Sequence, residues 1–209
     1  MKLWKYLGAT LLIIFALVIL FTSILKSASI RYSFSPFTET TTAALSPEKI
    51  IDYNLPSEGR ILPDNPLWFL ISFKDRIWLA ITPNIEKKAE LNLLFADERL
   101  VASNALFSKK EYNLGMAFLV KAEKYLEEAS QLEERARKKG IDTTKFIGRI
   151  TLAALKHREI IDGMLTFAPP EAKPEIIKVK NITCEVFVRE RNAMQEKGET
   201  PPNSPSEWD

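Results

Sequence analysis

The chain contains a single histidine, His157, and histidine is the side chain that most often ligates metals or changes its charge near neutral pH. It falls on the apolar seam of a helix predicted over residues 142–168, beside Ala153, Ala154 and Ile161. A di-iron site in a helical bundle needs paired Glu-x-x-His motifs. Position 154 is alanine and there is no second histidine, so that site is excluded and no metal site is predicted. We expect His157 to be a hydrogen-bonded core residue, with a pH-dependent switch or a metal ligand as the alternative.

A group of acids in the predicted helix 111–139 would supply paired carboxylates if they served acid–base chemistry or calcium binding. Lys121, Lys124 and Arg137 lie at helical spacing from them, which indicates a solvated charged face instead. The sequence has one cysteine, Cys184, and neither a glycine-rich phosphate loop nor a nucleophile elbow. We therefore predict no catalytic residue, no cofactor and no enzyme activity. The acids in question are Glu123, Glu127, Glu128, Glu133 and Glu134.

A helix is predicted over residues 66–81, where Asn65 supplies a capping side chain and Pro66 occupies the first turn. The segment is apolar nearly all round apart from Ser72 and residues 74–76. Such a helix is either central to a core or partly inserted in a membrane interface. We expect the helix over residues 66–81 to be buried in the core, with insertion into a membrane surface as the alternative. The aromatic residues expected to pack against the next two helices are Trp68, Phe69, Phe73 and Trp78. The candidate residues for an interaction or a switch are Trp68, Lys74, Asp75, Arg76, Trp78 and His157.

Residues 6–25 contain no charged side chain and, at about 1.5 Å per residue, reach across the roughly 30 Å hydrocarbon layer of a bilayer. Trp4 lies at one edge, as interfacial aromatic residues do. We predict an uncleaved anchor over residues 1–26, which makes membrane lipid an expected partner through residues 6–25. A cleaved signal peptide, which has a shorter apolar run, is the alternative. Basic residues flank both ends almost equally, so the positive-inside rule favours a cytoplasmic N-terminus only weakly. We expect a single-pass protein of the cell membrane with the bulk of the chain outside the cytoplasm.

The chain beyond the predicted anchor carries almost no net charge. The 209 residues have a formal charge of +2, but residues 1–29 hold three lysines and no acid, which leaves 26 basic against 27 acidic residues in the rest. No nucleic-acid partner is therefore expected. The length fits one modest domain. Composition predicts a flexible linker over residues 27–48, a helical domain over 49–196 and a disordered tail over 197–209.

Further helices are predicted where apolar residues repeat at spacings of three and four, over residues 85–108 with Asn84 as cap, 111–139 and 142–168. Alanine-rich seams and a short connection predict that the first two form a close antiparallel hairpin. Residues 171–196 are ambiguous because parts of them alternate like a strand, but a lone strand would leave its backbone unpaired, so we predict a helix. The fold class is therefore all-α, with an N-terminal transmembrane helix followed by a helical bundle built around a long antiparallel hairpin. The hairpin seams are Ala89, Leu93, Ala96, Leu100, Ser103 and Phe107, then Tyr112, Gly115, Leu119, Ala122, Leu126, Ala129, Glu133 and Ala136.

Several short motifs around the first two helices of the domain occur in an order that resembles a known family. They are Tyr53-x-Leu55-Pro56, Gly59-x-Ile61-Leu62-Pro63-Asp64-x-Pro66-Leu67, Lys74-Asp75-Arg76-Ile77, Lys87-Lys88-Ala89-Glu90 and Arg99-Leu100. Over residues 53–129, and more weakly around Lys156-His157, the chain resembles a prokaryotic family catalogued as domain of unknown function five-six-six-seven. Residues 57–59 stand where the family usually has a proline–glycine pair, so the entry turn is expected to differ. The resemblance implies a membrane-anchored helical protein and carries over no catalytic residue.

These observations together favour a membrane-anchored extracytoplasmic helical domain for protein interaction or envelope scaffolding, with a protein partner that the sequence does not identify. One alternative is an envelope sensor or regulator that binds a ligand between helices. Another is a cytoplasmic adaptor tethered to the membrane. A polar-lined cavity beside His157 would favour the sensor.

Overall fold

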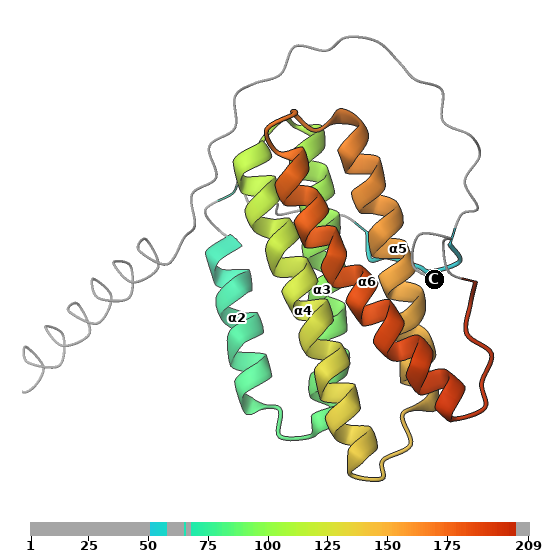
Figure 1. Ribbon diagram of the computed structural model, residues 1–209. Helices are drawn as coiled ribbons and strands as arrows, with labels where there is room; N and C mark the ends of the chain where they lie inside the picture. The colour runs from blue at the N-terminus through green and yellow to red at the C-terminus, as the bar shows by residue number, and fades with distance from the viewer. Residues whose placement is uncertain (1–50, 58–64, 66–67, 204–209) are drawn as a thin grey trace, which may run out of the picture. The chain divides into compact units, whose positions relative to one another are not determined.

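The computed structural model describes residues 51–57, 65 and 68–203, and within these residues it is an all-α bundle of five helices without a strand (Figure 1). The predicted all-α class and helical bundle are therefore confirmed. No helix of this described part is long and apolar enough to cross a bilayer. The predicted anchor at 1–26 and linker at 27–48 lie outside the described residues. The helices are α2 (Trp68–Ile81), α3 (Ile85–Ser108), α4 (Tyr112–Lys138), α5 (Thr144–Phe167) and α6 (Lys173–Glu196).

Helices α3 and α4 form the predicted hairpin and make the most extensive helix–helix contact of the bundle. Asn84 caps α3 as predicted, because its Oδ1 accepts a hydrogen bond from the backbone N–H of Lys87 at 2.9 Å. Every residue of the two predicted seams is buried. Near the turn, a Cβ added to Gly115 would lie 2.7 Å from the Phe107 ring, so glycine is what lets the two helices approach there.

Helices α5 and α6 complete the bundle. The segment 171–196, whose period was ambiguous, is helical, which confirms the prediction. Helix α6 packs against α5 and α4, and its inward face combines β-branched residues with the fully buried Phe187. Helix α5 ends just before Pro169 and Pro170, because proline cannot donate the backbone hydrogen bond that would extend the helix. The β-branched core residues of α6 are Ile176, Val179, Thr183 and Val186.

Residues 51–57, which precede α2 in the sequence, form an irregular arm that lies against the bundle. The backbone N–H of Ile51 donates to Glu159 Oε2 of α5 at 3.0 Å. Tyr53 packs against a core cluster drawn from α3, α4, α5 and α6, and Leu55 packs against a second one. The arm therefore fixes the first described residues of the chain to the interior of the bundle.

Helix α2 is the most peripheral helix of the bundle and packs against α3 (Figure 1). Its Trp68 ring meets the Phe118 ring of α4 edge-on, with centroids 5.4 Å apart. Phe73 and Trp78 are each 45% exposed, so the expectation that they lie in the core is wrong. For Phe73 the reason is that Asp75 faces α3, and a residue two positions away lies near the opposite side of the helix and faces outward. Trp78, three positions from Asp75, lies at the edge of the packed side, under the amine of Lys74. The side chain of Phe69 lies outside the part that the structure describes.

Candidate functional site

His157 on α5 is completely buried between two carboxylates from two other helices. Its Nδ1 lies 2.8 Å from Glu123 Oε1 on α4, and its Nε2 lies 3.0 Å from Asp97 Oδ1 on α3. The Tyr53 hydroxyl of the arm donates to the other Asp97 oxygen, Oδ2, at 2.7 Å. One hydrogen-bonded cluster, which we call the His157 cluster (Tyr53, Asp97, Glu123 and His157), therefore ties the arm to three helices.

The neighbours of His157 decide its charge. Both ring nitrogens face carboxylate oxygens, which accept hydrogen bonds when ionised, so the imidazolium with two N–H donors matches the geometry. Burial alone lowers the pKa of His157, but the charge of Glu123 and the hydrogen bonds to Asp97 and Glu123 raise it to about 9. Burial and the negative charge of Asp97 raise the pKa of the Tyr53 hydroxyl, which stays protonated as a donor. The cluster is therefore a buried ion triad closed by a neutral phenol.

A second buried ion pair holds α2 on the bundle. Arg99 of α3 donates through Nη2 to Asp75 Oδ2, and both side chains are almost fully buried. The guanidinium also lies 5.1 Å from the centroid of the Trp68 ring and 5.7 Å from that of Phe95. These distances suit cation–π attraction, which is strongest where water is excluded. Arg99 therefore binds α2 through both a carboxylate and an aromatic ring.

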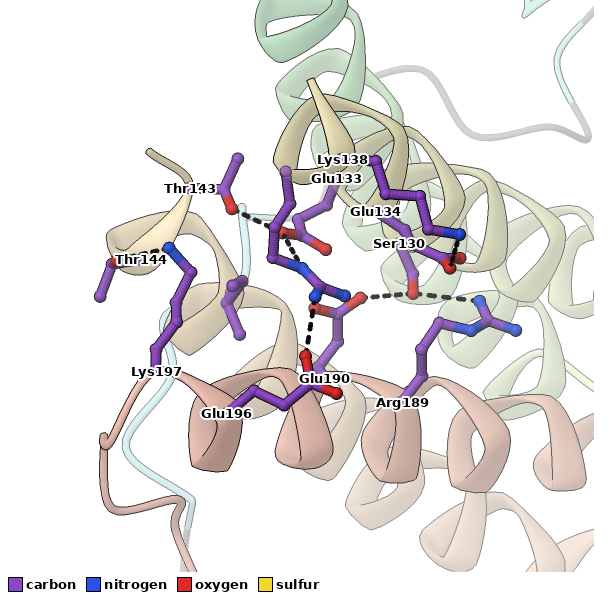
Figure 2. A network of polar contacts seen from close by, with 12 residues as sticks. Ser130, Glu133, Glu134, Lys138, Thr143, Thr144, Arg189, Glu190, Glu196 and Lys197 are labelled. Atoms are coloured by element: carbon purple, nitrogen blue, oxygen red, sulfur yellow. Dashed lines mark hydrogen bonds and ion pairs between the residues drawn. The ribbon is translucent and has the colours of Figure 1, made fainter. Parts of the chain in front are cut away.

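A third polar network links α4 and α6 to the loop before α5 (Figure 2). Ser130 Oγ donates to Glu190 Oε1 at 2.5 Å. Thr143 Oγ1 donates to Glu133 Oε1 at 2.5 Å, and Arg137 Nε lies 3.3 Å from the same oxygen. Glu133 and Glu190 are both buried, so this network places two acids in the interior with two partly buried cations beside them, Arg137 and Arg189.

The raised pKa of Glu190 makes the network sensitive to pH. Burial is the main cause; the hydrogen bond from Ser130 opposes it, the charge of Glu133 adds to it, and the resulting pKa is about 8. An unfolded glutamate ionises near pH 4.5. The folded protein thus retains, between about pH 4.5 and 8, a proton that the unfolded chain has released. Its stability therefore falls as pH rises through this window.

Replacing Glu190 by glutamine should remove that dependence. We expect Glu190→Gln to be more stable than wild type by about 4 kcal/mol at pH 8 and to differ little at pH 4.5. Urea unfolding of both proteins at several pH values measures the difference. Glu185→Gln, which changes an exposed acid of the same helix, is the control and should leave the pH dependence of wild type unchanged. A Glu190→Gln protein that is destabilised throughout would show that Glu190 is ionised and needed as an anion.

A cleft of about 410 Å³ opens where the start of α3, the end of α4 and the start of α5 meet. No residue of the His157 cluster lines it, so it does not supply the polar cavity beside His157 that the sensor hypothesis requires. Within the described residues, no group of three or more His, Cys, Asp or Glu side chains is arranged to hold a metal ion. The charged residues that line the cleft are Glu86, Glu90, Glu133, Asp142, Lys145 and Arg149.

The structure separates the six residues singled out from the sequence into three groups. Trp68 and Asp75 face the bundle around Arg99, whereas Lys74 lies 5.6 Å over the ring of Trp78 on the exposed side of α2. Arg76 is exposed on the same helix. His157 belongs to the His157 cluster in the core, as expected for a hydrogen-bonded core histidine.

Sequence reasoning missed the carboxylates of the buried clusters. Glu123 was predicted on a solvated face and is buried, so that prediction is wrong for it. Glu133 was assigned both to that face and to the hairpin seam, and its burial confirms the seam position rather than the solvated face. The physical reason is that buried partners from other segments, His157 and Thr143, compensate their burial. The spacing of residues does indicate that Glu123 is buried. It lies seven residues, or about two helical turns, from Met116 and from Ser130, and both of these are fully buried. Asp97, Arg99 and Glu190 were not singled out either.

Comparison with known proteins assigns the chain to a family. The family model described as Domain of unknown function (DUF5667) matches residues 60–170, which is more than half of the chain. The chain belongs to this family. The match confirms the resemblance and extends it through α5, so the DUF5667 region contains both the Asp75–Arg99 pair and three of the four members of the His157 cluster. Tyr53 and α6 lie outside the matched region. No curated protein and no solved structure matches the chain significantly.

Proposed function

We propose that this DUF5667 chain is a membrane-anchored extracytoplasmic domain that serves interaction or scaffolding in the cell envelope and performs no catalysis. The observation that carries the proposal is the outer face of α2, where five large hydrophobic side chains are 44–70% exposed. A contiguous apolar face of this kind is normally covered by another surface. The five residues, which we call the α2 outer face, are Leu70, Phe73, Ile77, Trp78 and Ile81.

The arrangement of the buried charges supports a structural role for them. Glu123 and Asp97 both contact His157, and Tyr53 covers Asp97 from the arm. Asp75 is completely buried against Arg99. A general acid or base has to reach a substrate proton directly or through one water, and these carboxylates are directed at partners within the fold. They are better suited to fix the register of the helices than to act on a substrate.

A second candidate function, an envelope sensor or regulator, is favoured by one contact. The arm is the first described segment after the predicted linker, and its Tyr53 hydroxyl bonds directly to the His157 cluster through Asp97. A change in the charge of His157 would act on this hydrogen bond. We rank this candidate second because the described cleft, where a ligand would fit, is lined by other residues.

The test is the location of α6 relative to the membrane in intact cells. Full-length chains carrying Cys184→Ser and one new cysteine, either Lys178→Cys on the exposed side of α6 or Lys2→Cys, are treated with a membrane-impermeant maleimide before and after lysis. We expect both chains to sediment with membranes, Lys178→Cys to react in intact cells and Lys2→Cys to react only after lysis. The reverse pattern would favour the cytoplasmic adaptor, and a chain that stays in the soluble fraction would refute the anchor.

A further inference from the structure

The α2 outer face is a continuous stripe. Leu70, Phe73, Ile77 and Ile81 follow one another at spacings of three, four and four, so they lie along one side of the helix, with Trp78 beside them. Ile81 and Leu70, at the two ends, are 70% and 60% exposed. The stripe therefore runs over most of the 14-residue helix, from Leu70 to Ile81, or about 17 Å.

The orientation of this stripe is fixed by the opposite side of the helix. Asp75 is buried against Arg99, and Trp68 packs against Phe118. Turning the apolar stripe into the bundle would pull Asp75 away from its buried cation, which is costly because each charge would remain without its partner. The apolar residues consequently face outward in the folded protein and cannot be buried by a simple rotation of α2.

The exposed charges of α2 itself are basic, and the partly exposed acid Glu98 of α3 is paired with Arg99. The acid of α2, Asp75, is buried, whereas Lys74 and Arg76 are exposed on the same helix. Lys121 of α4 lies near α2, since its Nζ is 5.0 Å over the Phe118 ring that Trp68 meets edge-on. Long basic side chains beside an apolar stripe can place their charges at lipid phosphates while their stems lie along the hydrophobic residues.

We propose that the α2 outer face binds the surface of an anionic lipid bilayer, with its apolar side chains at the level of the upper acyl chains and Lys74, Arg76 and Lys121 at the headgroups. Charge complementarity selects this occupant over a second copy of the chain, because two α2 faces would bring the same basic groups together. Of the proposed function, this inference about α2 depends only on the membrane anchor. The sequence between the predicted anchor and α2, residues 27–67, is short enough to hold the helix near a bilayer at an effective concentration on the order of millimolar.

The test uses the full chain in vesicles and a probe on the stripe. In a Cys184→Ser chain, Ile81→Cys carries an environment-sensitive fluorophore, and Ile177→Cys on α6, which is 47% exposed, serves as the matched control. In vesicles that contain phosphatidylglycerol, we expect the probe at 81 to shift to the blue and to be quenched by brominated acyl chains, and the probe at 177 to do neither. Thermal melts of both labelled chains check that the fold is retained.

Neutralising the basic residues beside the stripe should weaken the fluorescence signal of the probe at 81 in anionic vesicles. Lys74→Gln combined with Arg76→Gln should lower the ratio of docked to undocked α2 about 30-fold at low salt, because each basic residue near an anionic surface contributes about 1 kcal/mol. Vesicles of phosphatidylcholine alone should give a weaker signal in wild type and little change in this variant. Equal signals in both vesicle types would overturn the role assigned to the basic residues.

Flotation of the same vesicles separates this proposal from the anchor. If the chain floats with vesicles but the probe at 81 remains as water-exposed as the probe at 177, the bilayer proposal is wrong and the anchor stands. If the chain does not float unless anionic lipid is present, the anchor fails while the α2 signal still supports the bilayer proposal. A blue shift at 81 in detergent that grows with protein concentration would instead identify a second copy, or another protein, as the occupant and overturn the proposal.

Discussion

A His157→Gln variant is expected to lose about 3–5 kcal/mol of unfolding free energy at pH 6, because it removes the cation that lies between two buried carboxylates. Glutamine keeps hydrogen-bonding groups but carries no charge, so Asp97 and Glu123 would face one another across it. Urea unfolding measures the loss. Arg149→Gln is the control, since Arg149 and its partner Glu90 are each 53% exposed and such a pair contributes less than about 1 kcal/mol. A similarly small loss for His157→Gln would refute the buried ion triad.

The pH dependence of the same variant tests the charge of His157. With a pKa of about 9 in the folded protein and 6.5 in the unfolded chain, the folded state retains a proton that the unfolded chain loses between these values. The stabilisation by His157 is therefore complete below pH 6.5 and is lost as pH rises through 9. Wild type should lose stability over this window, and His157→Gln should lose less. Because Glu190 contributes between pH 4.5 and 8, the comparison is best made with Glu190→Gln in both proteins.

Removing one carboxylate from the His157→Gln variant gives an internal check. If repulsion and burial of unpaired acids cause the loss, Glu123→Gln should recover part of it in the double variant, although it is destabilising alone. If the two losses simply add, the residues act independently, and the packing of the imidazole ring rather than its charge explains the effect.

The helical periods were sufficient to predict most of the core but not its charges. Every position that spacings of three and four placed in the hairpin seams is buried, because a helix that packs on one side repeats its buried residues in that way whatever they are, although buried positions also lie outside these seams. Glu123 occupies such an inward position, yet its type is typical of a surface. Its hydrogen-bond partner, His157, lies 34 residues downstream, and Asp97, which contacts the other nitrogen of the same ring, lies 26 residues upstream of Glu123. A single-sequence pattern does not encode which helices will meet.

For helix α2, the sequence predicted a hydrophobic helix but not which of its sides faces the core. Its composition predicted a hydrophobic helix correctly, but apolar residues almost all round its axis gave no direction for the core. The direction is set by Asp75, because a buried carboxylate has to face its cation, and that cation belongs to the next helix. The residue that looked most like an interruption of the apolar pattern is the one that orients it.

Asp75→Asn is therefore expected to loosen α2 from the bundle while leaving the helix sequence otherwise intact. Asparagine can still accept a hydrogen bond, but among the described residues the buried guanidinium of Arg99 would keep only the partly exposed Glu98, 3.2 Å away, as an ionic partner. A loss of about 3 kcal/mol in the local opening free energy raises the open population about 100-fold. Cleavage by chymotrypsin after Phe73 or Trp78, followed by mass spectrometry of the full chain in detergent, should accelerate by that factor when opening and closing are fast relative to cleavage.

Lys74→Gln provides the comparison that isolates the buried pair. Lys74 Nζ lies 3.3 Å from the other Asp75 oxygen, but its side chain is largely exposed, so its contribution is expected to be below about 1 kcal/mol and the acceleration below about fivefold. Both variants keep the two cleavage sites and the α2 outer face, and both are measured in the same detergent, so differences in micelle binding by the stripe are minimised. Equal cleavage rates in the two variants would mean that Trp68 and its aromatic contacts, rather than the Asp75–Arg99 pair, hold α2 in place.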